Sequence, residues 1–249
     1  MTTNWPTARA AAVPVALLIA ATAFLLTHDV PSADAARSLA GTVSEWPGWA
    51  QHGVELASEG GLVLLAVLLA AAAWPARSRG PRQVAATVLG GVGVVLALAV
   101  SEVVKVLAAQ DRPCRTLADL AAVAPCPPVG DWSLPSNHAT LAAALAAALI
   151  WSVPRLWPLA LSLAGLVAAA RVGLGVHYPH DVVDGLVLGA VVVSASVLSL
   201  RRAATRWVTV TARVPVLAAL LGARRWPERI EQGRSAPDGV RDVHSSRAP

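Results

Sequence analysis

Six apolar stretches of nearly membrane-spanning length restrict the fold of this chain more than any other feature. They cover residues 10–27, 57–75, 84–104, 139–153, 156–170 and 182–200. A helix needs about 20 apolar residues to cross a bilayer. Only 14% of the 249 residues are charged, whereas a typical soluble domain has about 25%. We therefore predict an all-α fold, a polytopic membrane helical bundle with six transmembrane helices.

The first stretch has a second interpretation, a secretory signal peptide. Its only preceding charge is Arg9, and the segment ATAFLLTHDV lacks a convincing small-residue cleavage site. We therefore interpret this stretch as a membrane anchor.

The positive charge is almost all arginine, and its distribution predicts the topology. Arginines concentrate in the 76–83 connection and after the last apolar stretch, whereas the 28–56 loop carries four acidic residues and one arginine. Because cytoplasmic loops are enriched in basic residues, both termini are expected in the cytoplasm. The 28–56, 105–137 and 171–181 loops are then expected outside the cell membrane. This topology accounts for the arginines, so we expect no nucleic acid partner.

The chain is expected to form one membrane domain over residues 1–206, with its core at 57–200. Residues 207–226 are apolar but interrupted by an arginine and a proline, which favours an interfacial helix over a seventh span. The polar tail, 227–249, is expected to be disordered and cytoplasmic. Membrane lipids are the expected surroundings, and nothing in the sequence predicts the oligomeric state.

Two cysteines, Cys114 and Cys126, both fall in the predicted outer loop. Because the outside is an oxidising environment, we predict a disulfide between them, with two unpaired thiols as the alternative. A zinc site is not expected, since the chain has no CxxC spacing.

Three clusters of ionisable residues lie on the predicted outer side. Because ionisable side chains in or at the edge of a membrane are energetically costly, each of these residues is a functional candidate. In KVLAAQDRP, the only lysine of the chain, Lys105, precedes Arg112 by two helical turns. In LPSNHAT, Ser136 or Asn137 can cap the fourth apolar helix, whose free amides form an anion site, and His138 follows. Taken separately, snorkelling basic side chains and an ordinary helix cap would explain both clusters.

The third cluster, in RVGLGVHYPHDVVD, contains Arg171, His177 and, four residues later, Asp181. In a helical turn this spacing brings a carboxylate to an imidazole, where it fixes the tautomer and stabilises the protonated ring. The competing interpretation is a metal site made of His177, His180, Asp181 and Asp184. No further ligand-rich motif supports it, so no metal is expected.

Together the clusters place three cations, a helix N-terminus and two histidines on one face of the membrane. Positive charge and backbone amides stabilise the equatorial oxygens of a phosphoryl group during its transfer. One histidine can attack phosphorus while the other protonates the leaving oxygen. The sequence therefore predicts metal-independent phosphoryl chemistry without a cofactor.

These residues resemble the three motifs of the type 2 phosphatidic acid phosphatase (PAP2) superfamily, which is related to the vanadium haloperoxidases. The motifs K-x6-R-P, P-S-G-H and S-R-x5-H-x3-D appear as Lys105…Arg112-Pro113, Pro135-Ser136-Asn137-His138 and Ala170-Arg171…His177…Asp181. The resemblance extends over roughly residues 57–200.

The resemblance implies that His177 is the nucleophile of a phosphohistidine intermediate, that Asp181 orients it, and that His138 is the general acid. The implied phosphate-binding groups are Lys105, Arg112, Ser136, Arg171 and the backbone amide of Asn137.

Two positions depart from the family motifs. Asn137 replaces the glycine of the second motif, and Ala170 replaces the serine of the third. Because asparagine tolerates unusual backbone angles better than most residues, we expect chemistry to be retained. Loss of the serine hydroxyl is expected to weaken phosphate binding slightly.

We therefore expect a membrane lipid phosphatase whose site faces the outer leaflet and whose substrate keeps its tail in the bilayer. A polyprenyl diphosphate such as undecaprenyl diphosphate is the favoured substrate, with phosphatidic acid and phosphatidylglycerol phosphate as alternatives. A lipid phosphotransferase using the same phosphohistidine stays open. So does a non-catalytic transporter or scaffold, although binding alone would not require an oriented nucleophile.

Overall fold

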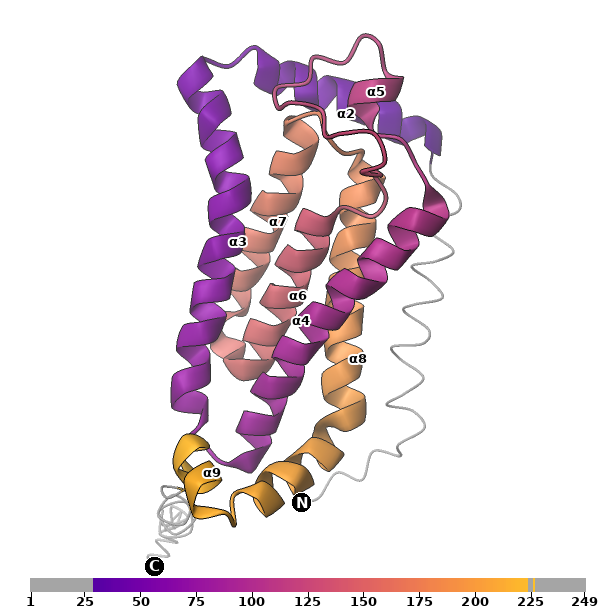
Figure 1. Ribbon diagram of the computed structural model, residues 1–249. Coiled ribbons are helices and arrows are strands. Elements are labelled where there is room, and N and C mark those ends of the chain that lie inside the picture. The colour runs from indigo at the N-terminus through magenta and orange to yellow at the C-terminus, as the bar shows by residue number, and fades with distance from the viewer. Residues whose placement is uncertain (1–28, 224–225, 227–249) are drawn as a thin grey trace, which may run out of the picture.

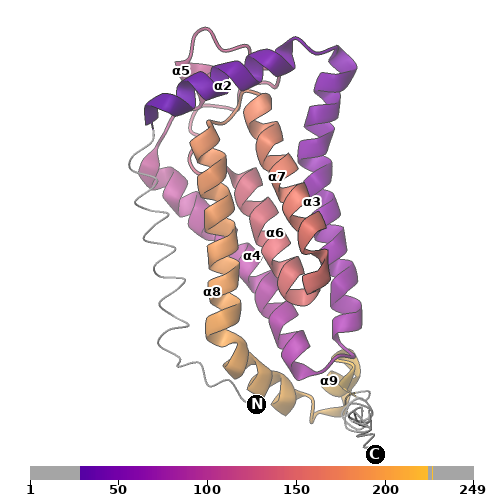
Figure 2. The same ribbon diagram turned by 180° about the vertical axis from the view of Figure 1, so that it is seen from behind.

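Five long helices form a bundle in the part of the chain that the computed structural model describes, residues 29–223 and 226. They are α3 (Gly48–Ala76), α4 (Pro81–Ala108), α6 (Asn137–Ser152), α7 (Trp157–Gly173) and α8 (Pro179–Thr211). The five helices run along the bundle between its two ends (Figures 1 and 2). Every regular element in the described part is helical, so the predicted all-α class is confirmed.

Four segments of the described chain are long and apolar enough to cross a membrane. They are Gly48–Ala76, Pro81–Thr116, Pro154–Gly173 and Pro179–Thr211. The helix α6 is apolar but has only 16 residues, and the predicted first span, 10–27, lies outside the described residues. The structure therefore contains four of the six predicted spans as candidates by length and composition.

The short helix α6 lies inside the bundle, where it packs against α3, α4, α7 and α8. Its alanines are buried, and Ala142, Ala144 and Ala148 are fully so. Figure 2 shows α6 between α7 and α8. Alanine side chains are small, so the neighbouring helices can approach the backbone of α6 closely.

Two glycines bring α8 into direct contact with the backbone of α6. A Cβ atom at Gly189 would lie 2.2 Å from the carbonyl oxygen of Thr140, and one at Gly185 would lie 2.6 Å from that of Ser136. No other residue fits at such distances. This contact fixes the start of α6, which carries His138, against the start of α8, which carries Asp181.

The end of the bundle where α6 and α8 begin is covered by polypeptide. The helix α2 (Asp29–Ser44) lies across it, together with the short helix α5 (Pro113–Thr116) and the 117–136 loop (Figure 1). A disulfide joins Cys114 to Cys126 within this cover. An ion pair between Arg37 of α2 and Asp119 of the loop, 3.0 Å long, links the two layers.

The opposite end of the bundle carries the shorter elements. The 3-10 helix η1 (Pro154–Leu156) joins α6 to α7, and α9 (Pro215–Leu220) follows α8. Because α8 continues to Thr211, the segment that we predicted as one interfacial helix is divided between the end of α8 and α9. The predicted disordered tail, 227–249, lies outside the described residues.

Candidate active site

His177 lies in the connection between α7 and α8, and Asp181 holds its ring. Oδ2 of Asp181 lies 3.3 Å from Nδ1 of His177 and accepts the backbone N–H of Tyr178 at 2.8 Å. The hydroxyl group of Ser133 donates a hydrogen bond to the same carboxylate. Both His177 and Asp181 are buried. The i,i+4 spacing therefore positions the imidazole as we predicted.

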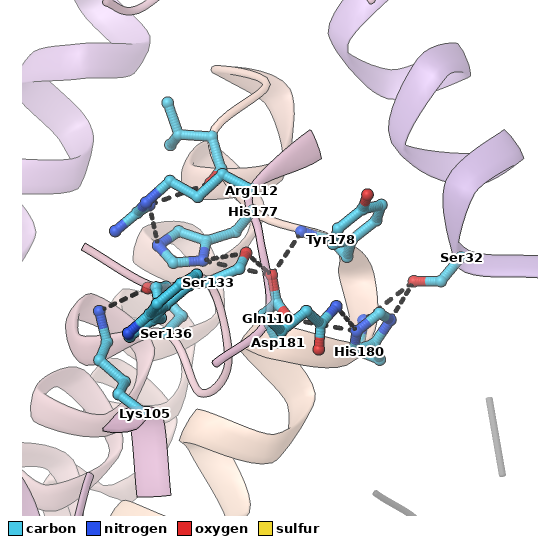
Figure 3. A network of polar contacts seen from close by, with 12 residues as sticks. Ser32, Lys105, Gln110, Arg112, Ser133, Ser136, His177, Tyr178, His180 and Asp181 are labelled. Atoms are coloured by element: carbon cyan, nitrogen blue, oxygen red, sulfur yellow. Dashed lines mark hydrogen bonds and ion pairs between the residues drawn. The ribbon is translucent and has the colours of Figure 1, made fainter. Parts of the chain in front are cut away.

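The other ring nitrogen of His177, Nε2, meets Arg112. The distance from NH1 of Arg112 to Nε2 is 2.9 Å, and the same NH1 donates to the Val176 carbonyl at 3.0 Å (Figure 3). A guanidinium has no acceptor atom, so Nε2 must carry the lone pair and Nδ1 the proton. Neutral His177 thus presents a nucleophilic nitrogen on the side opposite Asp181.

Burial keeps His177 neutral. Removal of the ring from water lowers the pKa of His177 to about 4, although the hydrogen bond and charge of Asp181 oppose this shift, while Arg112 and Arg171 add to it. A neutral imidazole is the form that can attack phosphorus.

Asp131 of the 117–136 loop binds both cations of the first motif. Its Oδ1 accepts hydrogen bonds from Nζ of Lys105 at 3.0 Å and from NH2 of Arg112 at 2.9 Å. Lys105 also donates to the Trp132 carbonyl, and Nε of Arg112 donates to the Asp131 carbonyl. Burial opposes ionisation of Asp131, but the hydrogen bonds from Arg112 and Lys105 outweigh it and hold its pKa below the usual range.

His138 and Arg171 form a second group around Glu59 of α3. Nε2 of His138 lies 2.8 Å from Oε1 of Glu59, and NH1 of Arg171 lies 3.8 Å from the same oxygen. Ser136 precedes α6 as its N-cap residue. The Oγ atom of Ser136 and the Nε atom of Arg171 are buried and have no hydrogen-bond partner among the described residues.

The side chain of Asn137 is held by α4. Its Oδ1 accepts a hydrogen bond from Ser101 at 2.7 Å, and its Nδ2 donates to Glu102. The substitution of the motif glycine thus adds a link between α4 and α6. Both polar groups of the added side chain, its amide nitrogen and its carbonyl oxygen, therefore have hydrogen-bond partners.

Residues 86–205 match the family model described as PAP2 superfamily. The match covers 120 of the 249 residues, so the likeness to the PAP2 superfamily extends over just under half of the chain. The matched region contains all three motifs, from Lys105 to Asp181.

Curated relatives resemble part of the chain. An undecaprenyl-diphosphatase from Sulfolobus acidocaldarius is 36% identical over 100 residues, which are 40% of this chain and 48% of that protein. A decaprenylphosphoryl-5-phosphoribose phosphatase from Mycobacterium tuberculosis is 35% identical over 129 residues, 52% of this chain and 66% of that protein. The chain thus matches about half the length of the first relative.

A solved structure shares the PAP2 fold with this chain. It is the transmembrane PAP2-type phosphatidylglycerolphosphate phosphatase from Bacillus subtilis, which superposes with a TM-score of 0.53 at 22% sequence identity. The superposition covers 72% of this chain and 91% of the other. At this identity the likeness establishes the fold alone.

Three residues outside the motifs contact residues of this site. Asp131 and Ser133 precede the second motif in an irregular loop, so no periodic pattern indicated where their side chains lie. Glu59 could have been identified from the sequence, because it is the only charged residue of the 57–75 apolar stretch. Such a residue is a functional candidate on energetic grounds.

The competing metal interpretation receives no support from the arrangement of side chains. Nδ1 of His180 lies 2.7 Å from Oγ of Ser32, and Nε2 lies 2.8 Å from the side-chain nitrogen of Gln110. Within residues 29–223 and 226, no three His, Cys, Asp or Glu side chains are grouped so that they could hold a metal ion.

Proposed function

We propose that this protein is a membrane lipid phosphatase that forms a phosphohistidine at His177. One observation carries the proposal: Nδ1 of the buried ring faces Asp181, while Nε2 faces Arg112, a cation of the first PAP2 motif. A nucleophile fixed beside a phosphate-binding group is suited to in-line attack on phosphorus.

The reaction would proceed in two steps. In the first, Nε2 of His177 forms a bond to phosphorus, the bond from phosphorus to the leaving oxygen breaks, and His138 protonates that oxygen. In the second, water attacks the phosphohistidine, His138 takes a proton from the water, and inorganic phosphate leaves. Asp181 stabilises the positive charge that His177 gains in the first step.

Lys105, Arg112, Ser136 and Arg171 would bind the phosphate oxygens. Oγ of Ser136 and Nε of Arg171 are buried without a hydrogen-bond partner among the residues described, which is costly unless a ligand uses them. Asp131 forms ion pairs with Lys105 and Arg112. These ion pairs would break when the two cations bind the phosphate.

The proposed substrate is a polyprenyl phosphate or diphosphate, such as undecaprenyl diphosphate. Both curated relatives bear the names of polyprenyl-lipid phosphatases. We infer six spans, with 10–27 and α6 completing the four candidate spans, both termini in the cytoplasm and the site at the outer leaflet. The arginines of the 76–83 connection and of the segment after residue 200 support this topology.

Phosphate release by purified protein in detergent with EDTA tests the proposal. The substrates are undecaprenyl diphosphate, phosphatidic acid and phosphatidylglycerol phosphate, each with wild type and His177→Ala. We expect release that survives EDTA and disappears in the variant, and radiolabelled phosphate trapped on the wild type in an acid-labile form.

Other outcomes would replace this proposal with a different one. Release that EDTA abolishes would restore the metal interpretation. Transfer of the phosphoryl group to an added alcohol in preference to water would identify a transferase. No release from any of these lipids by folded protein would favour a binding protein.

A further inference from the structure

We propose that Glu59 is a positioning residue for His138, which keeps the imidazole oriented and protonated for its role as general acid. This inference rests on the proposed function. Glu59 lies in α3, outside the region matched by the family model, so none of the three motifs includes it.

The contact between Glu59 and His138 has the geometry of an oriented dyad. Oε1 of Glu59 lies 2.8 Å from Nε2 of His138. The arrangement parallels Asp181 and Nδ1 of His177. Each histidine of the site therefore has its own carboxylate, and the two carboxylates come from different helices.

The outer part of α3 is held where this contact requires it. Two residues after Glu59, a Cβ atom at Gly61 would lie 2.6 Å from Cγ2 of Val167 in α7. This close approach of α3 to α7 fixes the position of Glu59 along the bundle axis, beside Arg171. Arg171 is four residues after Val167 in α7. The side chain of Glu59 is 59% exposed and that of His138 is 27% exposed, so this pair is less buried than His177 and Asp181.

The charges that act on His138 come from three elements. Burial of the ring disfavours a proton on His138 most, and Arg171 of α7 and Arg112, which precedes α5, act in the same direction, whereas Glu59 of α3 favours the proton. A general acid must hold its proton until the leaving oxygen needs it. Glu59 is the carboxylate that opposes the two guanidinium groups.

Each ring nitrogen of His138 has a separate role in the proposed proton transfers. Protonated His138 donates its Nε2–H to Glu59 and its Nδ1–H to the leaving oxygen as the phosphorus–oxygen bond breaks. The ring that remains is neutral, with Nδ1 free to take a proton from the water that attacks the phosphohistidine. Glu59 stays ionised throughout and exchanges no proton.

The test compares Glu59→Gln with Glu55→Gln on two substrates. Glu55 lies one turn earlier on α3 and faces His52 at 3.5 Å, so it is a matched control. Phosphatidic acid has an alkoxide leaving group that needs a proton, whereas the nitrophenolate of p-nitrophenyl phosphate leaves without one. General acids contribute about 10²–10⁴-fold, and we expect Glu59→Gln to lose roughly tenfold in kcat on phosphatidic acid alone.

Two further readouts separate positioning from a structural role. The alkaline limb of kcat on phosphatidic acid should move to lower pH in Glu59→Gln and move back in Glu59→Asp. In a His138→Ala background, Glu59→Gln should cause no additional loss. KM should be unchanged in the single variant, because the phosphate-binding cations remain.

Several results would overturn the assignment. A lower KM with unchanged kcat would mean that Glu59 merely occupies an anion site beside Arg171. Equal losses on both substrates, with an unshifted pH profile, would indicate a structural role. If wild type released no phosphate from any substrate, the proposed function itself would fail, whereas an active wild type matched by Glu59→Gln would refute only this inference.

Discussion

The two ring nitrogens of His177 have different partners, and this asymmetry has a measurable effect on pH dependence. Because burial lowers the pKa of His177 to about 4, the neutral nucleophile persists far below pH 6.5, the ordinary value for histidine. We expect kcat/KM for p-nitrophenyl phosphate to fall only as the pH approaches 4 to 5. A limb near pH 6.5 would contradict the buried environment of the ring.

The lowered pKa of His177 also predicts how the stability of the protein depends on pH. A histidine whose folded pKa lies below its unfolded value binds more protons when unfolded between about pH 4 and 6.5. The contribution of His177 to the free energy of unfolding is therefore present above pH 6.5 and is lost as the pH falls. Denaturant unfolding of wild type and His177→Ala at pH 5 and pH 7 measures this difference.

In the proposed reaction Asp131 would compete with phosphate for Lys105 and Arg112, whose side chains are only 5% and 4% exposed. Asp131→Asn should therefore tighten inhibition by orthovanadate roughly tenfold, the equivalent of about 1.4 kcal/mol. The melting temperature should fall, because two buried cations lose their carboxylate. Asp119→Asn is the control in the same loop, since Asp119 pairs with Arg37 instead. Unchanged vanadate inhibition in Asp131→Asn would show that the carboxylate does not compete.

The motif spacing allowed the His177–Asp181 contact to be predicted, because an i,i+4 pair is defined by local helix geometry. Asp131 and Glu59 could not be assigned in the same way. Their contacts join segments 26 and 79 residues apart, and such pairings depend on how the loop and α3 pack.

At the level of helices, the contact between α6 and α8 leaves no room for a side chain at Gly189. A Cβ atom there would meet the Thr140 carbonyl oxygen at 2.2 Å. Gly189→Ala should therefore separate the helices, destabilise the protein by about 1–3 kcal/mol and reduce activity. Gly91→Ala in α4 is the control, because its Cβ would meet nothing within 4 Å. Equal thermal stability of the two variants would refute the close contact.

Helix positions were largely predictable from the apolar stretches, but helix ends were not. The stretch 182–200 became α8 over Pro179–Thr211, because the arginines that follow it also favour a helix. Proline at the first turn, as in α4 and α8, extends helices toward their N-termini without costing a hydrogen bond. Apolar periodicity carries no information about either effect.

For the molecule in its membrane, the arginine distribution predicts opposite sides for two exposed positions. Val129 lies in the 117–136 loop and Arg79 in the 76–83 connection, and both natural cysteines are in a disulfide. Val129→Cys should react with a membrane-impermeant maleimide in intact cells. Arg79→Cys should react only after permeabilisation, and the wild type is the unlabelled control. Labelling in the reverse order would invert the proposed topology.

The fold class followed from composition, whereas the number of spans did not. Apolar composition identifies helices that avoid water, and α6 avoids water because other helices surround it. A helix enclosed by protein and a helix exposed to lipid have similar sequences. The assignment of α6 therefore required the tertiary structure.

The length of α6 has a further consequence for how substrate is found. Its 16 residues rise about 24 Å, less than the roughly 30 Å of a bilayer core. If its far end reaches the inner boundary, His138 lies about 6 Å inside the outer boundary of that core, within the outer leaflet and below the lipid phosphates. An amphiphile would then arrive by lateral diffusion, a search in two dimensions. Turnover in mixed micelles should accordingly follow the mole fraction of substrate at the surface, and dilution of the whole suspension at constant composition should leave it unchanged.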